Sequence, residues 1–344
     1  MDKPIKAYSL AELDTLIAGL GQPSFRAKQV AQWLYVHRVR SYDEMTNLPA
    51  ALRSTLKERF PLHVSTVVDR LVSSDGTCKY LIEYEDGVRV ETVCIPSRSN
   101  ERLTVCFSTQ AGCPMACTFC ATGREGLVRN LAPGEMVDQI LIAQEDAGRR
   151  VSNVVGMGQG EPFLNYENTM AALRILNDPK GLAIGARHIS VSTCGIIPGI
   201  ERFSREPEQF TLAVSLHAAI QNVRNVLMPK VARYNLGALK AALKSYISTT
   251  KRRVTLEYVM IRDMNDSEED LSALCNFCAG LLCHVNLIPL NEIAGSPFQP
   301  SSSSTVAKWL ATIQSRGTEA TLRDSRGSDI AGACGQLKNS HAEK

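Results

Sequence analysis

The sequence is organised around one stretch, Cys113-Pro-Met-Ala-Cys117-Thr-Phe-Cys120. Three thiolates at this spacing can surround one compact metal centre, and soft thiolates select iron–sulfur clusters, zinc or copper(I) over hard cations. A structural zinc ion or a ferredoxin-type cluster takes four protein ligands, so three cysteines leave one coordination position open for a substrate or cofactor. Zinc with a fourth ligand elsewhere in the chain is the alternative interpretation. The tight spacing argues against three unrelated buried thiols.

The composition is that of an ordinary globular protein, with 44% hydrophobic and 21% charged residues among 344. A net charge of +3 permits a nucleic-acid partner but does not indicate one. The first residues lack the apolar core of a signal peptide, and no run approaches the roughly 18 apolar residues of a membrane span. The eleven cysteines include the metal motif and suit a reducing compartment. We therefore expect a cytoplasmic protein with no membrane association.

The N-terminal region, up to about residue 60, has the apolar spacing of helices. Ser9 and Glu12 form a capping box, Ser24 is expected to cap a second helix over residues 25–36, and a third helix is predicted over 49–59. The basic residues here are equally consistent with a solvated helix face and with a surface that touches RNA. They are Arg26, Lys28, Arg38 and Arg40.

Residues 66–96 change to a period of two, which predicts strands. Asp75-Gly76 and Asp86-Gly87 stand between the apolar runs as hairpin turns. The segment is therefore predicted to form a small antiparallel sheet that links the helical region to the core.

From residue 103 onward, apolar runs alternate with amphipathic helices, which predicts an α/β fold with a parallel sheet. The sheet can be doubly wound or form a full or partial barrel. The runs are 103–108, 153–157, 189–193, 212–216, 254–261, 285–289 and 320–322. The helices include 133–147, 166–176, 236–248, 267–281 and 303–315.

Polar residues gather where these predicted strands end. After the second strand, Gly156-Met-Gly158-Gln-Gly160-Glu161-Pro162 allows a ligand close to the backbone, and Glu161 can accept a hydrogen bond from an ammonium group. A dinucleotide site is not favoured, because Phe163 occupies the last glycine position of that motif. Later strand ends add Ser192, Ser215-Leu216-His217 and Asn291. Each alone is more typical of a turn or a structural residue, but together on one rim they favour a shared polar ligand.

Several cysteines lie outside the motif. Cys334 stands between glycines in a predicted mobile loop, where a thiol can move and react, and Cys106 lies seven residues before Cys113. Cys275 and Cys278 share one face of a predicted amphipathic helix, so we interpret them as core residues and not as a second metal site.

The C-x3-C-x2-C pattern and the Gly160-Glu161-Pro162 segment resemble the radical S-adenosylmethionine (SAM) superfamily. Segments over nearly the whole chain further resemble the RlmN and Cfr family of adenine C2/C8 RNA methyltransferases. They are Pro23-Ser-Phe25-Arg26, Val90-Glu91-Thr92-Val93, Cys106-Phe-Ser-Thr-Gln110, Arg326-Gly-Ser-Asp329-Ile330 and Ala333-Cys334-Gly335-Gln336. The chain departs from the family pattern at Gln159, within 218–235 and at Glu292.

This resemblance implies a partial (β/α) barrel of the radical SAM type with an N-terminal helical accessory domain. We expect residues 1–62 to form that domain and to be a candidate RNA contact, and residues 63–98 to form the small antiparallel extension. Residues 99–325 are expected to form the partial barrel, and residues 326–344 a mobile segment that carries Cys334.

The resemblance also implies site residues and cofactors. Cys113, Cys117 and Cys120 would hold a [4Fe-4S] cluster whose fourth iron binds SAM. The implied SAM contacts are Gly160, Glu161, Ser192, Ser215, Leu216, His217 and Asn291. Two SAM molecules are expected per turnover, one to methylate Cys334 and one to start radical chemistry on that methyl group.

In the implied reaction, the carbon radical adds to adenine, Glu91 removes the ring proton as general base, and Cys106 releases the product by forming a disulfide with Cys334. Without the resemblance, Glu91 would be interpreted as an exposed strand residue.

The implied substrates are 23S rRNA and tRNA, with a flavodoxin or ferredoxin as electron donor and a monomeric enzyme. The Arg326-Gly-x-Asp-Ile segment favours methylation at C2 over C8. The alternatives are a C8 methyltransferase of the same family, a zinc-stabilised RNA-binding protein without catalysis, and a radical SAM enzyme that acts on a small molecule or peptide.

Overall fold

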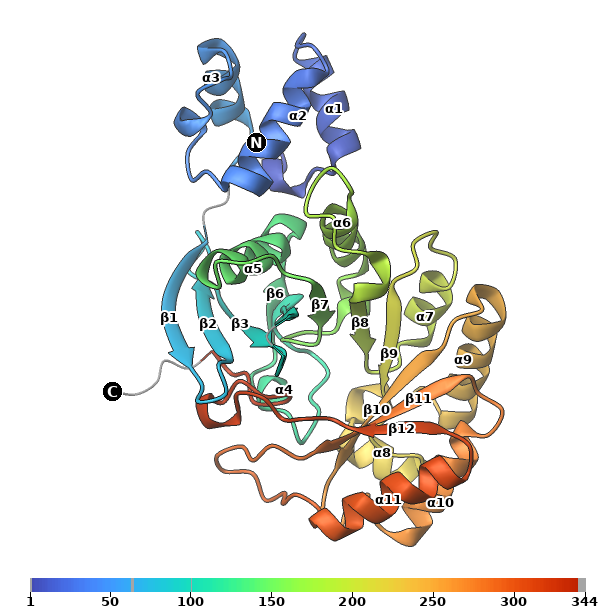
Figure 1. Ribbon diagram of the computed structural model, residues 1–344. Helices are drawn as coiled ribbons and strands as arrows, with labels where there is room; N and C mark the ends of the chain where they lie inside the picture. The colour runs from blue at the N-terminus through green and yellow to red at the C-terminus, as the bar shows by residue number, and fades with distance from the viewer. Residues whose placement is uncertain (1, 63–64, 100, 340–344) are drawn as a thin grey trace.

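The computed structural model describes residues 2–62, 65–99 and 101–339 (Figure 1). Its main sheet is ten-stranded, with the order β1-β2-β3-β4-β7-β8-β9-β10-β11-β12. From β4 to β12 every neighbouring pair is parallel. The parallel strands are β4 (Leu103–Cys106), β7 (Asn153–Gly156), β8 (Ile189–Thr193), β9 (Thr211–Ser215), β10 (Val254–Met260), β11 (Cys283–Pro289) and β12 (Glu319–Leu322). The predicted α/β class is confirmed, and the sheet stays open as a partial barrel.

Helices connect the parallel strands and bury their apolar faces against the sheet and one another. The predicted helices correspond to α5 (Pro133–Asp146), α6 (Tyr166–Asn177), α9 (Leu236–Thr250), α10 (Glu268–Cys278) and α11 (Ser303–Ser315). Three short helices were not predicted: α4 (Ala121–Glu125), α7 (Ile197–Phe203) and α8 (Gln221–Leu227). None of the helices in the described part of the chain is both long and apolar enough to cross a membrane.

The predicted antiparallel strands are β1 (Thr66–Val72), β2 (Cys78–Glu83) and β3 (Arg89–Pro96). They do not form a separate sheet, because β3 pairs with β4 and makes them the edge of the main sheet. Gly76 and Gly87 have φ angles of 83° and 76°, as the predicted turns require. A second, two-stranded antiparallel sheet is formed by β5 (Gln110–Gly112) and β6 (Leu127–Asn130).

The N-terminal head contains α1 (Leu10–Gly19), α2 (Phe25–Gln32) and α3 (Ala50–Arg59) and lies above α5 in Figure 1. The capping box of Ser9 and Glu12 is confirmed. The cap at Ser24 is wrong, because this residue is already helical and its side chain makes no capping hydrogen bond. Beyond Gln32, the predicted second helix continues as a π-helix, η2 (Trp33–His37).

The basic residues of the head are not equivalent. Arg38 is half-buried and pairs with Glu145 of α5, 3.6 Å away, while Arg26 donates to the Asn47 carbonyl. Lys28 and Arg40 are exposed. Part of the predicted basic surface therefore holds the head together or joins it to the core.

The division of the chain into four domains stays a prediction.

Candidate active site

A cavity of about 150 Å³ lies at the carboxyl ends of the parallel strands. Most of the predicted site residues line it: Cys113, Cys117, Cys120, Gly160, Glu161, Ser192, Ser215, His217, Asn291 and Cys334. Cys106 lines an adjoining cavity of about 260 Å³, which Cys334 and Asn291 also border. Leu216 is buried in the core, and Glu91 lines neither cavity.

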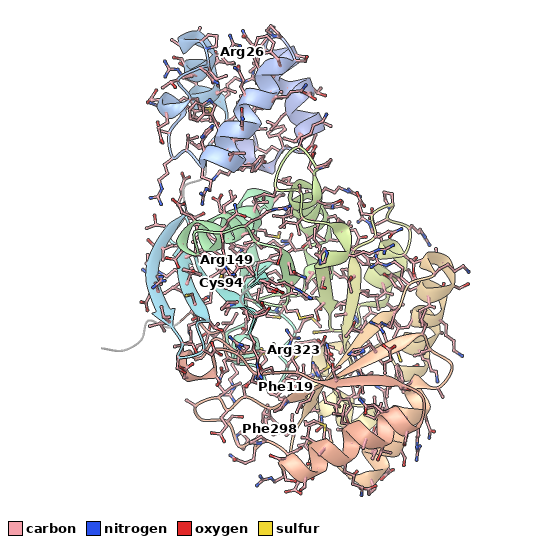
Figure 2. The ribbon with its side chains drawn as sticks, viewed as in Figure 1. Arg26, Cys94, Phe119, Arg149, Phe298 and Arg323 are labelled. Atoms are coloured by element: carbon pink, nitrogen blue, oxygen red, sulfur yellow. The ribbon has the colours of Figure 1, made fainter. Side chains whose placement is uncertain are left out.

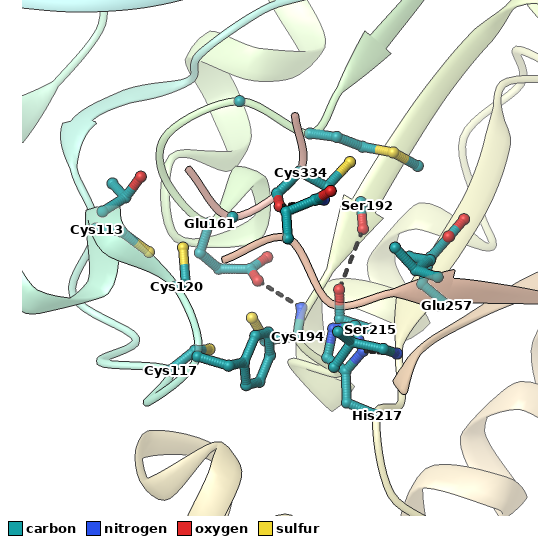
Figure 3. A pocket seen from close by; sticks show the side chains of 18 of the residues that line it. Cys113, Cys117, Cys120, Glu161, Ser192, Cys194, Ser215, His217, Glu257 and Cys334 are labelled. Atoms are coloured by element: carbon teal, nitrogen blue, oxygen red, sulfur yellow. Dashed lines mark hydrogen bonds between the residues drawn. The ribbon is translucent and has the colours of Figure 1, made fainter. Parts of the chain in front are cut away.

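The cysteine motif is the loop between β5 and β6. Cys113 N–H donates to the Gly126 carbonyl at 2.7 Å, which closes the loop, and Thr118 N–H donates to the Leu227 carbonyl at 3.0 Å. Gly112 is required at the entrance, because its φ is +73° and a Cβ there would lie 2.0 Å from the Gly126 oxygen. The backbone thus places all three thiols on one cavity (Figure 3).

The three motif thiols border one cavity, so they could hold a metal centre there. A zinc ion draws its thiolates to about 2.3 Å from one centre, whereas the thiolates of a [4Fe-4S] cluster bind separate irons. Burial raises the pKa of the Cys113 thiol to about 12 and also raises that of Cys120. A bound metal would favour the deprotonated thiolates.

Glu161 is buried beside the motif and is held from both sides. Its Oε2 accepts from Cys194 N–H at 2.6 Å, and its Oε1 accepts from Phe163 N–H at 3.0 Å. Burial raises the pKa of this carboxyl. Each carboxylate oxygen has a second lone pair, so Glu161 can still accept a hydrogen bond from a ligand ammonium group.

The glycines before Glu161 serve a second purpose beside the expected one. A Cβ on Gly158 would lie 2.7 Å from the Phe107 carbonyl, and one on Gly160 would lie 2.7 Å from Gln110. The chain after β4 therefore already fills the space beside both glycines. They permit close packing of two backbone segments, in addition to lining the cavity.

The ends of β8 and β9 supply the next wall. The Ser192 and Ser215 hydroxyls lie 3.5 Å apart across the two strands (Figure 3). His217 is buried, with its Nδ1 accepting from Val259 N–H at 3.1 Å. Burial, followed by the nearby Arg224, lowers the pKa of His217 to about 3. The ring is therefore neutral and carries its proton on Nε2.

The C-terminal segment, residues 323–339, folds back over the cysteine motif. Ala121 N–H donates to the Gly335 carbonyl at 2.7 Å, and the Thr122 hydroxyl donates to the Leu337 carbonyl at 2.6 Å. Asn291 donates its side-chain amide to the Cys334 carbonyl at 3.1 Å. Gly335 has a φ of +85°, which favours glycine.

Cys106 lies beside this segment at the end of β4. It packs with Val93 and Leu337 in a small apolar cluster, and burial raises the pKa of its thiol to about 12. All eleven cysteines are free thiols. Cys275 and Cys278 are buried on α10, as predicted for core residues.

Glu91 on β3 is fully buried, which corrects its interpretation as an exposed strand residue. Its Oε1 lies 2.8 Å from Lys79 Nζ, and its Oε2 accepts from Lys338 N–H at 2.7 Å and Asn339 N–H at 3.3 Å. The end of the described chain therefore covers this carboxylate.

Sequence reasoning missed an ion pair in the cavity wall. Arg323 Nη1 lies 3.3 Å from Glu257 Oε2 and 3.4 Å from Met157 Sδ. The charge of Cys334 is the largest cause of the raised pKa of Arg323, ahead of burial, which lowers it. The sequence did offer one signal for this pair, because Glu257 is a single carboxylate inside the buried strand β10. Figure 2 shows Arg323 near Phe119 in the interior, far from Arg26 in the head.

Comparisons with known proteins agree with this geometry. A sequence model of the radical SAM superfamily matches residues 107–275, and a model described as the ribosomal RNA large subunit methyltransferase N-terminal domain matches residues 5–62. A "Probable dual-specificity RNA methyltransferase RlmN" from Clostridium novyi is 42% identical over 98% of both chains. One of the same description from Alkaliphilus metalliredigens is 42% identical over 100% of this chain and 97% of its own. The crystal structure of a radical SAM methyltransferase from Sphaerobacter thermophilus has 45% identity and a TM-score of 0.93, covering 98% of this chain and all of its own.

Proposed function

The chain belongs to the RlmN family of radical SAM methyltransferases, and we propose that it methylates C2 of adenosine in 23S rRNA and in tRNA. The observation that carries this proposal is the meeting of Cys334 with the motif cysteines in one cavity, with Cys106 in the cavity beside it. When a protein cysteine carries the methyl group, it must lie next to the cluster site, and a second thiol must lie near it to release the product. The two RNA substrates are suggested by the relatives described as having dual specificity.

The residues fit a [4Fe-4S] cluster held by Cys113, Cys117 and Cys120, with SAM on the fourth iron. The cluster and SAM together supply the one-electron chemistry that an electron-poor carbon such as C2 of adenine requires. The proposed SAM contacts include Glu161 for the ammonium group and the Ser192 and Ser215 hydroxyls. Electrons are proposed to come from a flavodoxin or ferredoxin, and the enzyme is proposed to act as a monomer in the cytoplasm.

Cys334 is proposed to accept a methyl group from one SAM, forming a thioether. After removal of one hydrogen atom from this methyl group, at the expense of a second SAM, its carbon bonds to C2 of adenine. Glu91 then takes up the C2 proton, and the one electron that must also leave the adduct would be accepted by a bound cluster. A closed-shell thioether then joins the protein to the RNA.

Cys106 is proposed to release the product. Its thiolate attacks the Cys334 sulfur, and the electron pair of the carbon–sulfur bond goes to the methylene carbon, which takes up a proton and becomes the new methyl group. A Cys106–Cys334 disulfide remains, which an external thiol must reduce before the next turnover. Attack requires Cys106 to lose its proton, so its buried, protonated state describes the enzyme at rest.

The head is proposed to contribute to RNA binding. Lys28 and Arg40 are exposed there and are free of the packing role of Arg38. Phosphate contacts from such residues add affinity that falls with salt concentration.

Nucleoside analysis tests the proposal directly. Protein reconstituted without oxygen, with iron and sulfide, should convert adenosine in 23S rRNA fragments and in tRNA to 2-methyladenosine, as read by mass spectrometry. The Cys334→Ala variant should give none. Formation of 8-methyladenosine would overturn the C2 assignment, and modification of rRNA alone would overturn the second substrate.

A further inference from the structure

Lys79 and Glu91 form a buried ion pair beside the C-terminal segment. They stand on β2 and β3, where Glu91 is opposite Leu81 and Lys79 is opposite Val93, so the two residues are diagonal neighbours on one face of the sheet. Their Nζ and Oε1 atoms lie 2.8 Å apart, with side-chain exposures of 8% and 1%. Both charges are thus taken out of water.

Stability alone does not explain this pair. Two buried charges must be desolvated, and apolar side chains of similar volume often stabilise a fold as well or better. The neighbours on the same face of these two strands, Leu81 and Val93, are buried and apolar. A Leu or Met at position 79 would suit this face of the sheet if Glu91 were not required.

The two oxygens of the Glu91 carboxylate have different partners. Oε2 accepts the backbone N–H groups of Lys338 and Asn339. Oε1 is buried and lies 2.8 Å from Lys79 Nζ. The backbone of the C-terminal segment and the Lys79 ammonium group therefore hold the carboxylate from two sides.

Lys79 also reaches the segment that carries Cys334. Its Nζ donates to the Ala331 carbonyl at 3.3 Å, three residues before Cys334. A second carboxylate, that of Glu125 on α4, has a pKa raised first by burial and then by the charge of Glu91. Lys79 therefore links Glu91 to this segment, in a region that holds two carboxylates.

We propose that Lys79 is a positioning residue for the proton transfer from C2: its ammonium group holds the Glu91 carboxylate in place and in register with the Cys334 segment. This inference rests on the proposed function, in which Glu91 is the base. In the step itself, the proton passes from C2 to the Glu91 carboxylate, and the electron pair of the C–H bond stays with the ring.

The experiment compares Lys79→Met and Lys79→Arg with Lys6→Met. Lys6 is a matched control, because it forms another buried lysine–carboxylate pair, with Asp138 at 2.6 Å and exposures of 8% and 5%. Three quantities are measured without oxygen: Cys334 methylation by mass spectrometry, RNA covalently attached to protein on a denaturing gel, and methylated RNA.

In the Lys79→Met variant, Cys334 should be methylated normally and the covalent RNA adduct should accumulate. Product formation should fall roughly a hundredfold or more, which is the lower end of the rate contribution of a general base. Lys79→Arg should restore most of the product and remove the adduct. Lys6→Met should show neither effect in its folded fraction. If Lys79→Met does not fold, Lys79→Gln makes the same comparison with a neutral polar side chain.

Normal turnover in the neutral variants, or a loss of Cys334 methylation together with turnover, would overturn the role of Lys79. The Glu91→Gln variant distinguishes the hypothesis about Lys79 from the hypothesis that Glu91 is the base. If Glu91→Gln accumulates adduct and Lys79→Met does not, the inference about Lys79 fails alone. If Glu91→Gln forms product normally, the proposed base itself is wrong.

Discussion

The cysteine motif and the C-terminal segment meet in one cavity, but they are held there in opposite ways. The motif lies between β5 and β6, so the chain immediately before and after it largely fixes its position, with one distant contact from Thr118 to the Leu227 carbonyl. The C-terminal segment is held by Asp75, Glu91 and Thr122, whose partners are 252, 247 and 215 residues away in sequence. The metal site should therefore survive changes that release the segment, whereas loss of the metal site should stop every later step.

The largest expected effect follows from removing one motif thiol. Cys117→Ala should contain almost no cluster iron and should not cleave SAM, because two remaining thiolates cannot hold the cluster. Iron and sulfide analysis after anaerobic reconstitution measures this. Cys275→Ala is the matched control, since this cysteine is buried on α10 away from the cavity, and it should keep its iron. Full SAM cleavage by iron-free Cys117→Ala would contradict the assignment.

The local character of the motif explains what the sequence could predict. Strand and helix periodicity located the parallel strands and the long helices, and residues at strand ends such as Ser192, Ser215 and Asn291 do reach one cavity. The helices α7 and α8 were missed because each has only seven residues, and α7 also contains Pro198 and Gly199. Such short helices have little periodicity and depend on packing for their stability.

Features made by distant segments could not be predicted in this way. Periodicity does not show which strand pairs with which, so the joining of β3 to β4 was not foreseen. The same holds for the Arg323–Glu257 and Lys79–Glu91 pairs, whose partners are 66 and 12 positions apart. Glu91 was selected by resemblance alone, because a strand pattern does not show that the C-terminal segment buries this residue.

The next largest effect separates the two thiols outside the motif. Cys106→Ala should methylate Cys334 and then stall with RNA attached to Cys334, which gives a nuclease-sensitive shifted band on a denaturing gel. Cys334→Ala and the double variant should give no such band, because neither has a methyl group to activate.

Cys94→Ala is the control for this comparison, since Cys94 is also buried and stands opposite Val105, beside Cys106. It should turn over as the parent enzyme does. Multiple turnover by Cys106→Ala would show that another group releases the RNA and would end the proposed role of Cys106.

A moderate effect is expected from loosening the segment without replacing a cysteine. Thr122→Val keeps the shape of the side chain but removes the donor to the Leu337 carbonyl. A buried carbonyl without a partner costs about 1–3 kcal/mol, so the docked population, and with it turnover, should fall roughly tenfold. Cluster iron should be unchanged.

Thr55→Val is a suitable control, because the Thr55 hydroxyl donates to a backbone carbonyl within the exposed part of α3. It should leave turnover unchanged. A loss of iron in Thr122→Val would show that the segment and the motif are not held independently.

The smallest effect concerns the protonation of Cys106. Burial raises the pKa of its thiol from the ordinary value near 9 to about 12, while the nearby Arg323 opposes this shift. At neutral pH the thiol is therefore protonated, and its thiolate fraction should rise about tenfold for each pH unit up to the pKa. In the Cys334→Ala background, alkylation of Cys106 by iodoacetamide, followed by peptide mass spectrometry, should accelerate from pH 7 to pH 10 without a plateau.

Arg323→Gln removes the opposing positive charge, so it should slow the reaction at each pH, whereas Arg98→Gln, which breaks only the exposed pair with Asp324, should not. A plateau below pH 9 would mean that Cys106 is already ionised in the resting enzyme and is poised to attack before RNA binds.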